Sequence, residues 1–182
     1  MEIYWRMTHL KMPDPLLSDI RRAAVRGEER TIMIERVDPS NVHLAGRIHS
    51  TAWKESHRSF CRPDFIESHT PERQTEYLRS KLNSGSSVYM LTDGEPVGII
   101  SVTGSLIEDL YVLPDFQNRG YGSRLLRYAM KQCAGVPTLW ILENNERAGR
   151  LYRRMGFQET GQRKMVTDGL DEIEFVYLQS LP

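Results

Sequence analysis

Apolar residues recur along the chain with two spacings, which predict its helices and strands. A spacing of three to four residues is typical of amphipathic helices, whereas continuous or alternating β-type runs are typical of strands. Helical spacing predicts helices at residues 14–27, 42–53, 70–85, 120–133 and 148–155. β-Type runs predict strands at residues 31–37, 87–91, 96–102, 106–112, 138–142, 163–166 and 172–178. Residues 56–65 show neither pattern, and we expect them to be irregular.

The connections between these segments predict one mixed α/β domain. Asp93-Gly94 is a strong tight-turn dipeptide, so the strands on either side of it should form an antiparallel hairpin. The next strand follows closely, which indicates a three-stranded meander. The run at 138–142 is apolar without alternation, as in a strand buried on both faces. We expect a domain at residues 31–182, preceded by an extension at residues 1–30 that contains a helix.

Composition and charge exclude several classes of protein. The chain has 182 residues, two cysteines and equal numbers of acidic and basic residues, 24 of each. Two cysteines are too few for a disulfide framework, and no apolar stretch is long enough to span a membrane or to form a secretory signal. We therefore expect a cytoplasmic protein that binds neither membranes nor, because it is neutral overall, nucleic acid.

Positive charge is nevertheless concentrated in one part of the chain. Residues 116–154 contain eight basic and two acidic residues. Within this stretch, the turn from Gln117 to Ser123 holds Gly120 and Gly122 at a predicted strand-to-helix junction. Glycines there let a ligand approach the backbone, and the first turn of a helix offers unpaired N–H donors. The turn therefore predicts an anion site, to which Arg119, Arg124 and Arg127 would add positive charge.

Two motifs in this region resemble those of the GCN5-related N-acetyltransferases. The run Q-N-R-G-Y-G at residues 117–122 is similar to the family signature Q/R-x-x-G-x-G/A, whose loop binds the pyrophosphate of acetyl-coenzyme A. The pattern N-x-x-A-x-x-x-Y-x-x-x-G-F, from Asn145 to Phe157, follows at the expected separation. The resemblance covers about residues 97–158. It implies a mostly antiparallel sheet whose fourth and fifth strands splay apart.

The resemblance also implies a site and a reaction. Acetyl-coenzyme A would be the cosubstrate, and an amine would attack its thioester directly, without a covalent enzyme intermediate. Tyr152 resembles the family's general acid, and Glu108 is the first candidate base, with Asp109 second. Because side chains alternate along a strand, we expect only one of these two carboxylates to face the cleft. The expected coenzyme-binding residues are Leu110, Tyr111, Val112, Gln117, Asn118, Arg119, Gly120, Tyr121, Gly122, Ser123 and Asn145.

Several residues also have a simpler structural interpretation. Asn145 is a good helix cap, and Trp53 fits either the core or an acceptor pocket. Four arginines at positions 147, 150, 153 and 154 are typical of a solvated helix face, from which one could reach a coenzyme phosphate. The five histidines lack metal-ligand spacing, so no metal is expected.

The identity of the acceptor and the function of the domain stay open at this point. The acceptor could be a small-molecule or a peptide amine, and the chain could form a homodimer. The alternative function is a non-catalytic module that binds acyl-coenzyme A as a sensor or in an interaction.

Overall fold

The computed structural model describes residues 31–59, 61–167 and 170–178. The helix expected at residues 14–27, and with it the proposed extension at 1–30, lies outside these residues. The helices are α2 (Val42–His57), α3 (Pro63–Glu67), α4 (Pro71–Asn83), η1 (Pro114–Phe116, a 3₁₀ turn), α5 (Tyr121–Met130) and α6 (Glu146–Arg154). The strands are β1 (Ile32–Arg36), β2 (Ser87–Asp93), β3 (Pro96–Thr103), β4 (Leu106–Val112), β5 (Thr138–Leu142), β6 (Phe157–Thr167) and β7 (Leu170–Tyr177).

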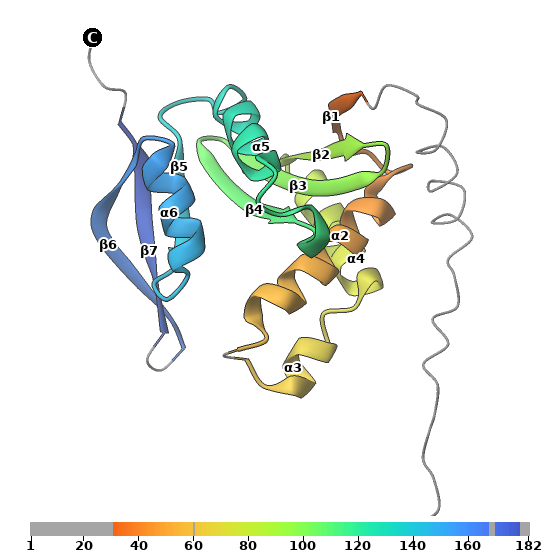
Figure 1. The fold of residues 1–182 in the computed structure, drawn as a ribbon, viewed down its shortest axis with the longest axis horizontal. Coiled ribbons are helices and arrows are strands. Elements are labelled where there is room, and N and C mark those ends of the chain that lie inside the picture. The colour runs from red at the N-terminus through yellow and green to blue at the C-terminus, as the bar shows by residue number, and fades with distance from the viewer. Residues whose placement is uncertain (1–30, 60, 168–169, 179–182) are drawn as a thin grey trace, which may run out of the picture. The chain divides into compact units, whose positions relative to one another are not determined.

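The strands form one seven-stranded sheet in the order β1-β2-β3-β4-β5-β7-β6 (Figure 1). Every neighbouring pair is antiparallel except β4 and β5, which run parallel. The expected α/β class, the mostly antiparallel sheet and the meander of β2, β3 and β4 are therefore confirmed.

Helices pack on both faces of the meander because side chains alternate between the faces of a strand. Val88 and Met90 of β2 pack with residues of α2 and α4, whereas Tyr89 and Leu91 pack with residues of α5. The contact between α2 and α4 is close: a Cβ atom added to Gly46 would lie 2.1 Å from the Thr75 hydroxyl oxygen. Two cores, one on each face, thus hold β2, β3 and β4 in place.

Strand β5 is less buried than its apolar sequence predicts. Leu139 and Ile141 are buried, but Thr138, Trp140 and Leu142 between and beside them are only half-buried. Helices α2 and α4 pack on β2, β3 and β4. The expectation of burial on both faces was wrong because the face of β5 that carries Trp140 forms part of a cleft instead.

Three element boundaries also differ from expectation. Pro63 starts the short helix α3 inside the stretch expected to be irregular. Helix α5 ends at Met130, so Cys133 packs against the core from the following turn. Strand β6 begins at Phe157, six residues before the expected start, because an exposed strand at the end of the sheet shows no apolar alternation.

Candidate active site

The sheet opens between β4 and β5. These two strands pair only through Leu106 with Thr138 and Ile107 with Leu139. Directly after the paired positions, β4 contains a bulge, where the register with β3 slips and Asp109 has a φ of 50°. A bulge bends its strand and increases the local twist. The expected splay of the fourth and fifth strands is present, and it creates a cleft of about 590 Å³.

The cleft gathers nearly all the residues that the sequence singled out. Both catalytic candidates, Tyr152 and Glu108, line it, as does Asp109. So do the expected coenzyme-binding residues Leu110, Tyr111, Val112, Gln117, Asn118, Gly120, Tyr121, Gly122, Ser123 and Asn145. Arg119 is not among its lining residues, because its guanidinium lies over the Phe116 ring, 5.3 Å from the centroid.

The turn before α5 forms one end of the cleft. Gly120 is the N-cap of α5 and has a φ of 83°, a left-handed conformation that favours glycine. Asn118 has a φ of 61°, and the Gln117 side-chain amide donates to the Val112 carbonyl at 2.9 Å. These contacts aim the start of α5, with the unpaired N–H donors of a helix N-terminus, at the cleft. This arrangement suits an anionic ligand.

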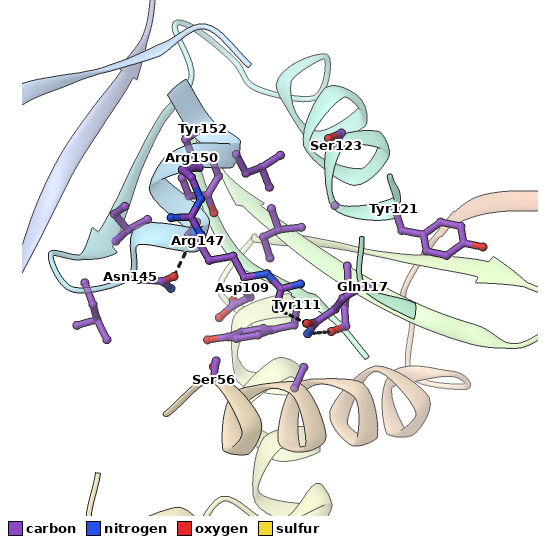
Figure 2. A pocket seen from close by; sticks show the side chains of 18 of the residues that line it. Ser56, Asp109, Tyr111, Gln117, Tyr121, Ser123, Asn145, Arg147, Arg150 and Tyr152 are labelled. Carbon is purple, nitrogen blue, oxygen red and sulfur yellow. Dashed lines mark hydrogen bonds between the residues drawn. The ribbon is translucent and has the colours of Figure 1, made fainter. Parts of the chain in front are cut away.

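Helix α6 supplies the positive charge. Arg147, Arg150 and Arg154 line the cleft, whereas Arg153 pairs with Glu159. Arg147 reaches across the cleft, where its guanidinium donates to the side-chain oxygen of Gln117 (Figure 2). It also donates to the side-chain oxygen of Asn118 at 3.2 Å. Arg147, Arg150 and Arg154 are exposed, as expected of a solvated helix face, and they also line the cleft. Their spacing of three and four residues is the signal that places them along one side of α6.

The residues expected to add positive charge at this turn lie elsewhere. Arg124 and Arg127 of α5 do not line the cleft, and Arg127 points toward the Met155 sulfur at 4.0 Å. Residues 121–123, by contrast, line it. The cations of the site therefore come from the helix across the cleft, because the first turn of α5 faces the cleft with its backbone.

Tyr152 lies on α6 with its ring in the core and with access to the cleft. The side chain is 7% exposed and packs near Phe157 and Phe175, with ring centroids 5.9 and 6.3 Å away. Burial raises the pKa of the phenol well above its ordinary value of 10. The hydroxyl therefore stays protonated at neutral pH, as a proton donor must be.

Glu108 and Asp109 both turn toward the same cation. The Lys81 ammonium donates to Glu108 and to Asp109, at 2.8 Å in each case. The expectation that only one carboxylate faces the cleft was wrong, since the bulge at Asp109 breaks the alternation. Asp109 also accepts hydrogen bonds from Ser101 at 2.7 Å and Tyr77 at 3.2 Å, and its side chain is 10% exposed. The Glu108 side chain, at 34%, is the more accessible of the two.

Asn145 has the capping role that its position suggested. Its side-chain oxygen accepts a hydrogen bond from the Ala148 N–H at 3.1 Å, at the start of α6. The same residue lines the cleft. Its structural and binding interpretations are therefore compatible.

No sequence motif indicated a second group of lining residues. Ala52, Glu55, Ser56 and His57, at the end of α2, form the side of the cleft opposite α6. Glu172 of β7 contributes a further carboxylate. Only folding brings these segments to β4 and β5, and no local motif marks them.

Comparisons with known proteins agree with this geometry. Residues 84–159 match the domain described as "Acetyltransferase (GNAT) domain". A 68-residue part of the chain is 35% identical to the peptidyl-lysine N-acetyltransferase YjaB of Salmonella typhimurium. This match covers 37% of this chain and 46% of YjaB. The chain thus matches less than half the length of this relative.

Solved structures extend the likeness to most of the fold. The PaiA N-acetyltransferase of Thermoplasma acidophilum, solved with coenzyme A, has a TM-score of 0.63 at 19% identity and covers 81% of this chain and 99% of its own. YncA of Salmonella typhimurium, solved with acetyl-CoA, has a TM-score of 0.61 at 18% identity. The match covers 84% of this chain and 98% of YncA. The fold is that of these solved N-acetyltransferases. The chain is therefore similar to the GCN5-related N-acetyltransferases, and the family match covers residues 84–159. None of the helices in the described part of the chain is long and apolar enough to cross a membrane.

Proposed function

We propose that the protein is an N-acetyltransferase that moves the acetyl group of acetyl-CoA to a primary amine by direct attack. The observation that carries this proposal is the joining of two features in one cleft: an anion-binding turn faced by three arginines, and a protonated phenol. The diphosphate of the coenzyme fits the first feature and its thioester fits the second. Two solved structural neighbours were determined with coenzyme A or acetyl-CoA.

In this proposal, a different set of residues binds each part of the coenzyme. The backbone N–H groups of residues 120–123 would bind the pyrophosphate, together with the α6 arginines. Beyond Ile107, β4 no longer pairs with β5, so the backbone of residues 110–112 can pair with the amides of the pantetheine arm. In this arrangement the thioester would lie near Tyr152.

The reaction requires two proton movements. As the amine nitrogen bonds to the acetyl carbon, the carbon–sulfur bond breaks and the sulfur leaves as a thiolate. The Tyr152 hydroxyl donates its proton to that sulfur and regains one from solvent. The nitrogen loses a proton, for which Glu108 is the proposed acceptor, directly or through water. Asp109 is the weaker base, because its hydrogen bonds and the nearby Lys81 stabilise its charged form.

Calorimetry and a thiol-release assay test the proposal together. Coenzyme A should bind and raise the melting temperature, by an amount equivalent to about 2.7 kcal/mol at a hundredfold excess over Kd. Incubation with acetyl-CoA and a panel of amines should then release free thiol. A failure to bind coenzyme A at millimolar concentration would contradict the proposal. Binding without thiol release from any amine would instead support a non-catalytic acyl-CoA-binding module.

A further inference from the structure

A second cavity, of about 710 Å³, adjoins the coenzyme cleft. Four residues line both spaces: His57, Tyr111, Leu142 and Glu172. The second cavity is otherwise bounded by the end of α2, by α3 and by the β6–β7 hairpin. A molecule seated in it can therefore extend a reactive group past Tyr111 into the cleft.

Aromatic and branched aliphatic side chains dominate the walls of this cavity. Phe65 and Val166, from α3 and β6, both line the cavity and are 51% and 53% exposed, so their apolar surface is available to a ligand. Trp53 lies between the imidazoles of His57 and His69, with ring centroids 3.9 and 3.5 Å away. This double stack fixes the indole, so one wall of the cavity is formed in advance.

The charged residues of the cavity are paired with each other or with close neighbours. Arg62 bonds to Asp64 at 3.2 Å, and Glu172 bonds to Lys164 at 2.7 Å. These partners partly neutralise the two carboxylates that a polycation would bind. Such a polycation would also approach the three arginines in the adjoining cleft, which repel positive charge.

Resting on the proposed function, we infer that this cavity is the acceptor subsite and that it selects primary amines carried on an aromatic or branched aliphatic group. The apolar group gains free energy by covering Phe65 and Val166 and leaving water. Its amine, on a short linker, reaches the thioester through the junction at Tyr111. Diamines and polyamines, which have no such group, are poor acceptors.

The test compares apolar primary amines with a diamine and a polyamine in the thiol-release assay with the full chain. We expect kcat/KM for 2-phenylethylamine and 3-methylbutylamine to exceed that for 1,4-diaminobutane and spermidine by about tenfold or more. Phe65→Ala and Val166→Ala should each lower kcat/KM for the apolar amines severalfold while leaving the Kd of coenzyme A unchanged. Val136→Ala is the matched control, because Val136 is 60% exposed but lines neither cavity.

The outcomes separate this inference from the proposed function. A preference for the diamine, or unchanged kinetics in both cavity variants, overturns the inference while the acetyltransferase activity stands. If no amine releases thiol, the proposed activity fails, and direct titration of the coenzyme-bound protein with 2-phenylethylamine decides the subsite. Binding weakened by Phe65→Ala and Val166→Ala, but not by Val136→Ala, then supports it, and binding that is absent or equal in all variants overturns it.

Discussion

Two residues of α6, Tyr152 and Arg147, face the same cleft with different chemistry. Tyr152 combines a buried ring with a protonated hydroxyl, because burial disfavours the charged phenolate. Arg147, one turn earlier, is exposed and bonds across the cleft to two uncharged amide oxygens. A charged phosphate is a stronger partner for a guanidinium than an amide. The two residues therefore make separable predictions, one for turnover and one for binding.

Replacing Tyr152 by Phe should reduce turnover without preventing coenzyme binding. The substitution keeps the ring that packs near Phe157 and Phe175 and removes only the proton donor. We expect kcat to fall about 10²- to 10⁴-fold, the usual contribution of a positioned acid. Thiol release gives kcat, and calorimetry should show a Kd within about twofold of wild type. Tyr128→Phe is the control, because Tyr128 lines neither cavity; equal turnover in the two variants would contradict the role of Tyr152.

Replacing Arg147 by Ala should weaken coenzyme binding. We expect the Kd of coenzyme A to rise about tenfold or more, because a hydrogen bond to a charged group contributes about 1.5–3 kcal/mol. Arg124→Ala serves for comparison, since Arg124 belongs to the same basic stretch but does not line the cleft. Titration calorimetry measures the Kd of coenzyme A for both variants. Similar affinities for the two variants would show that Arg147 does not contact the coenzyme.

At the scale of elements, the start of α5 depends on backbone conformation more than on side chains. Gly120 caps this helix at a φ of 83°, and a Cβ atom added there would meet no atom within 4 Å. The cost of a side chain at this position is therefore conformational strain, with no steric clash. Gly85, after α4, has the same properties at a φ of 91° but lies outside the cleft.

These two glycines provide a matched comparison. Gly120→Ala and Gly85→Ala should each destabilise the fold by about 1–2 kcal/mol, the strain of a left-handed alanine. Only Gly120→Ala should also weaken coenzyme binding, because it shifts the N–H donors at the start of α5. Urea unfolding gives the stabilities, and calorimetry gives the affinities. Equal coenzyme affinities would argue against an anion site at this helix.

At the scale of the whole molecule, one buried carboxylate connects four elements. Asp109 of β4 bonds to Ser101 of β3, to Tyr77 and Lys81 of α4, and lies 3.4 Å from the His49 ring nitrogen of α2. Burial alone raises the pKa of this carboxyl. The hydrogen bond with His49 and the charge of Lys81 outweigh that effect and hold the pKa well below its ordinary value of 3.8.

This arrangement predicts how stability depends on pH. A carboxyl whose pKa is lower in the folded than in the unfolded chain stabilises the fold above about pH 4, and the contribution is lost as the pH falls further. Asp109→Asn should therefore cost about 3 kcal/mol at pH 7, because it leaves a buried cation with one partner fewer. The difference from wild type should shrink as the pH falls from about 4 toward 2. Thermal unfolding of wild type and variant across this pH range measures the difference in stability. Replacement of the exposed Glu35 by Gln should cause no pH-dependent difference of this kind.

The sequence by itself predicted the order of the elements apart from α3, and it singled out the residues of the turn before α5. Both are local properties: helical spacing, β-type runs and the glycines at a strand-to-helix junction involve neighbours in the chain. The tertiary structure decided which arginines face the cleft, why Glu108 and Asp109 share a cation, and where the second cavity lies. These features depend on the bulge in β4 and on contacts between segments far apart in the chain. A repeat pattern records which side of an element is apolar, but it does not record which distant element packs against it.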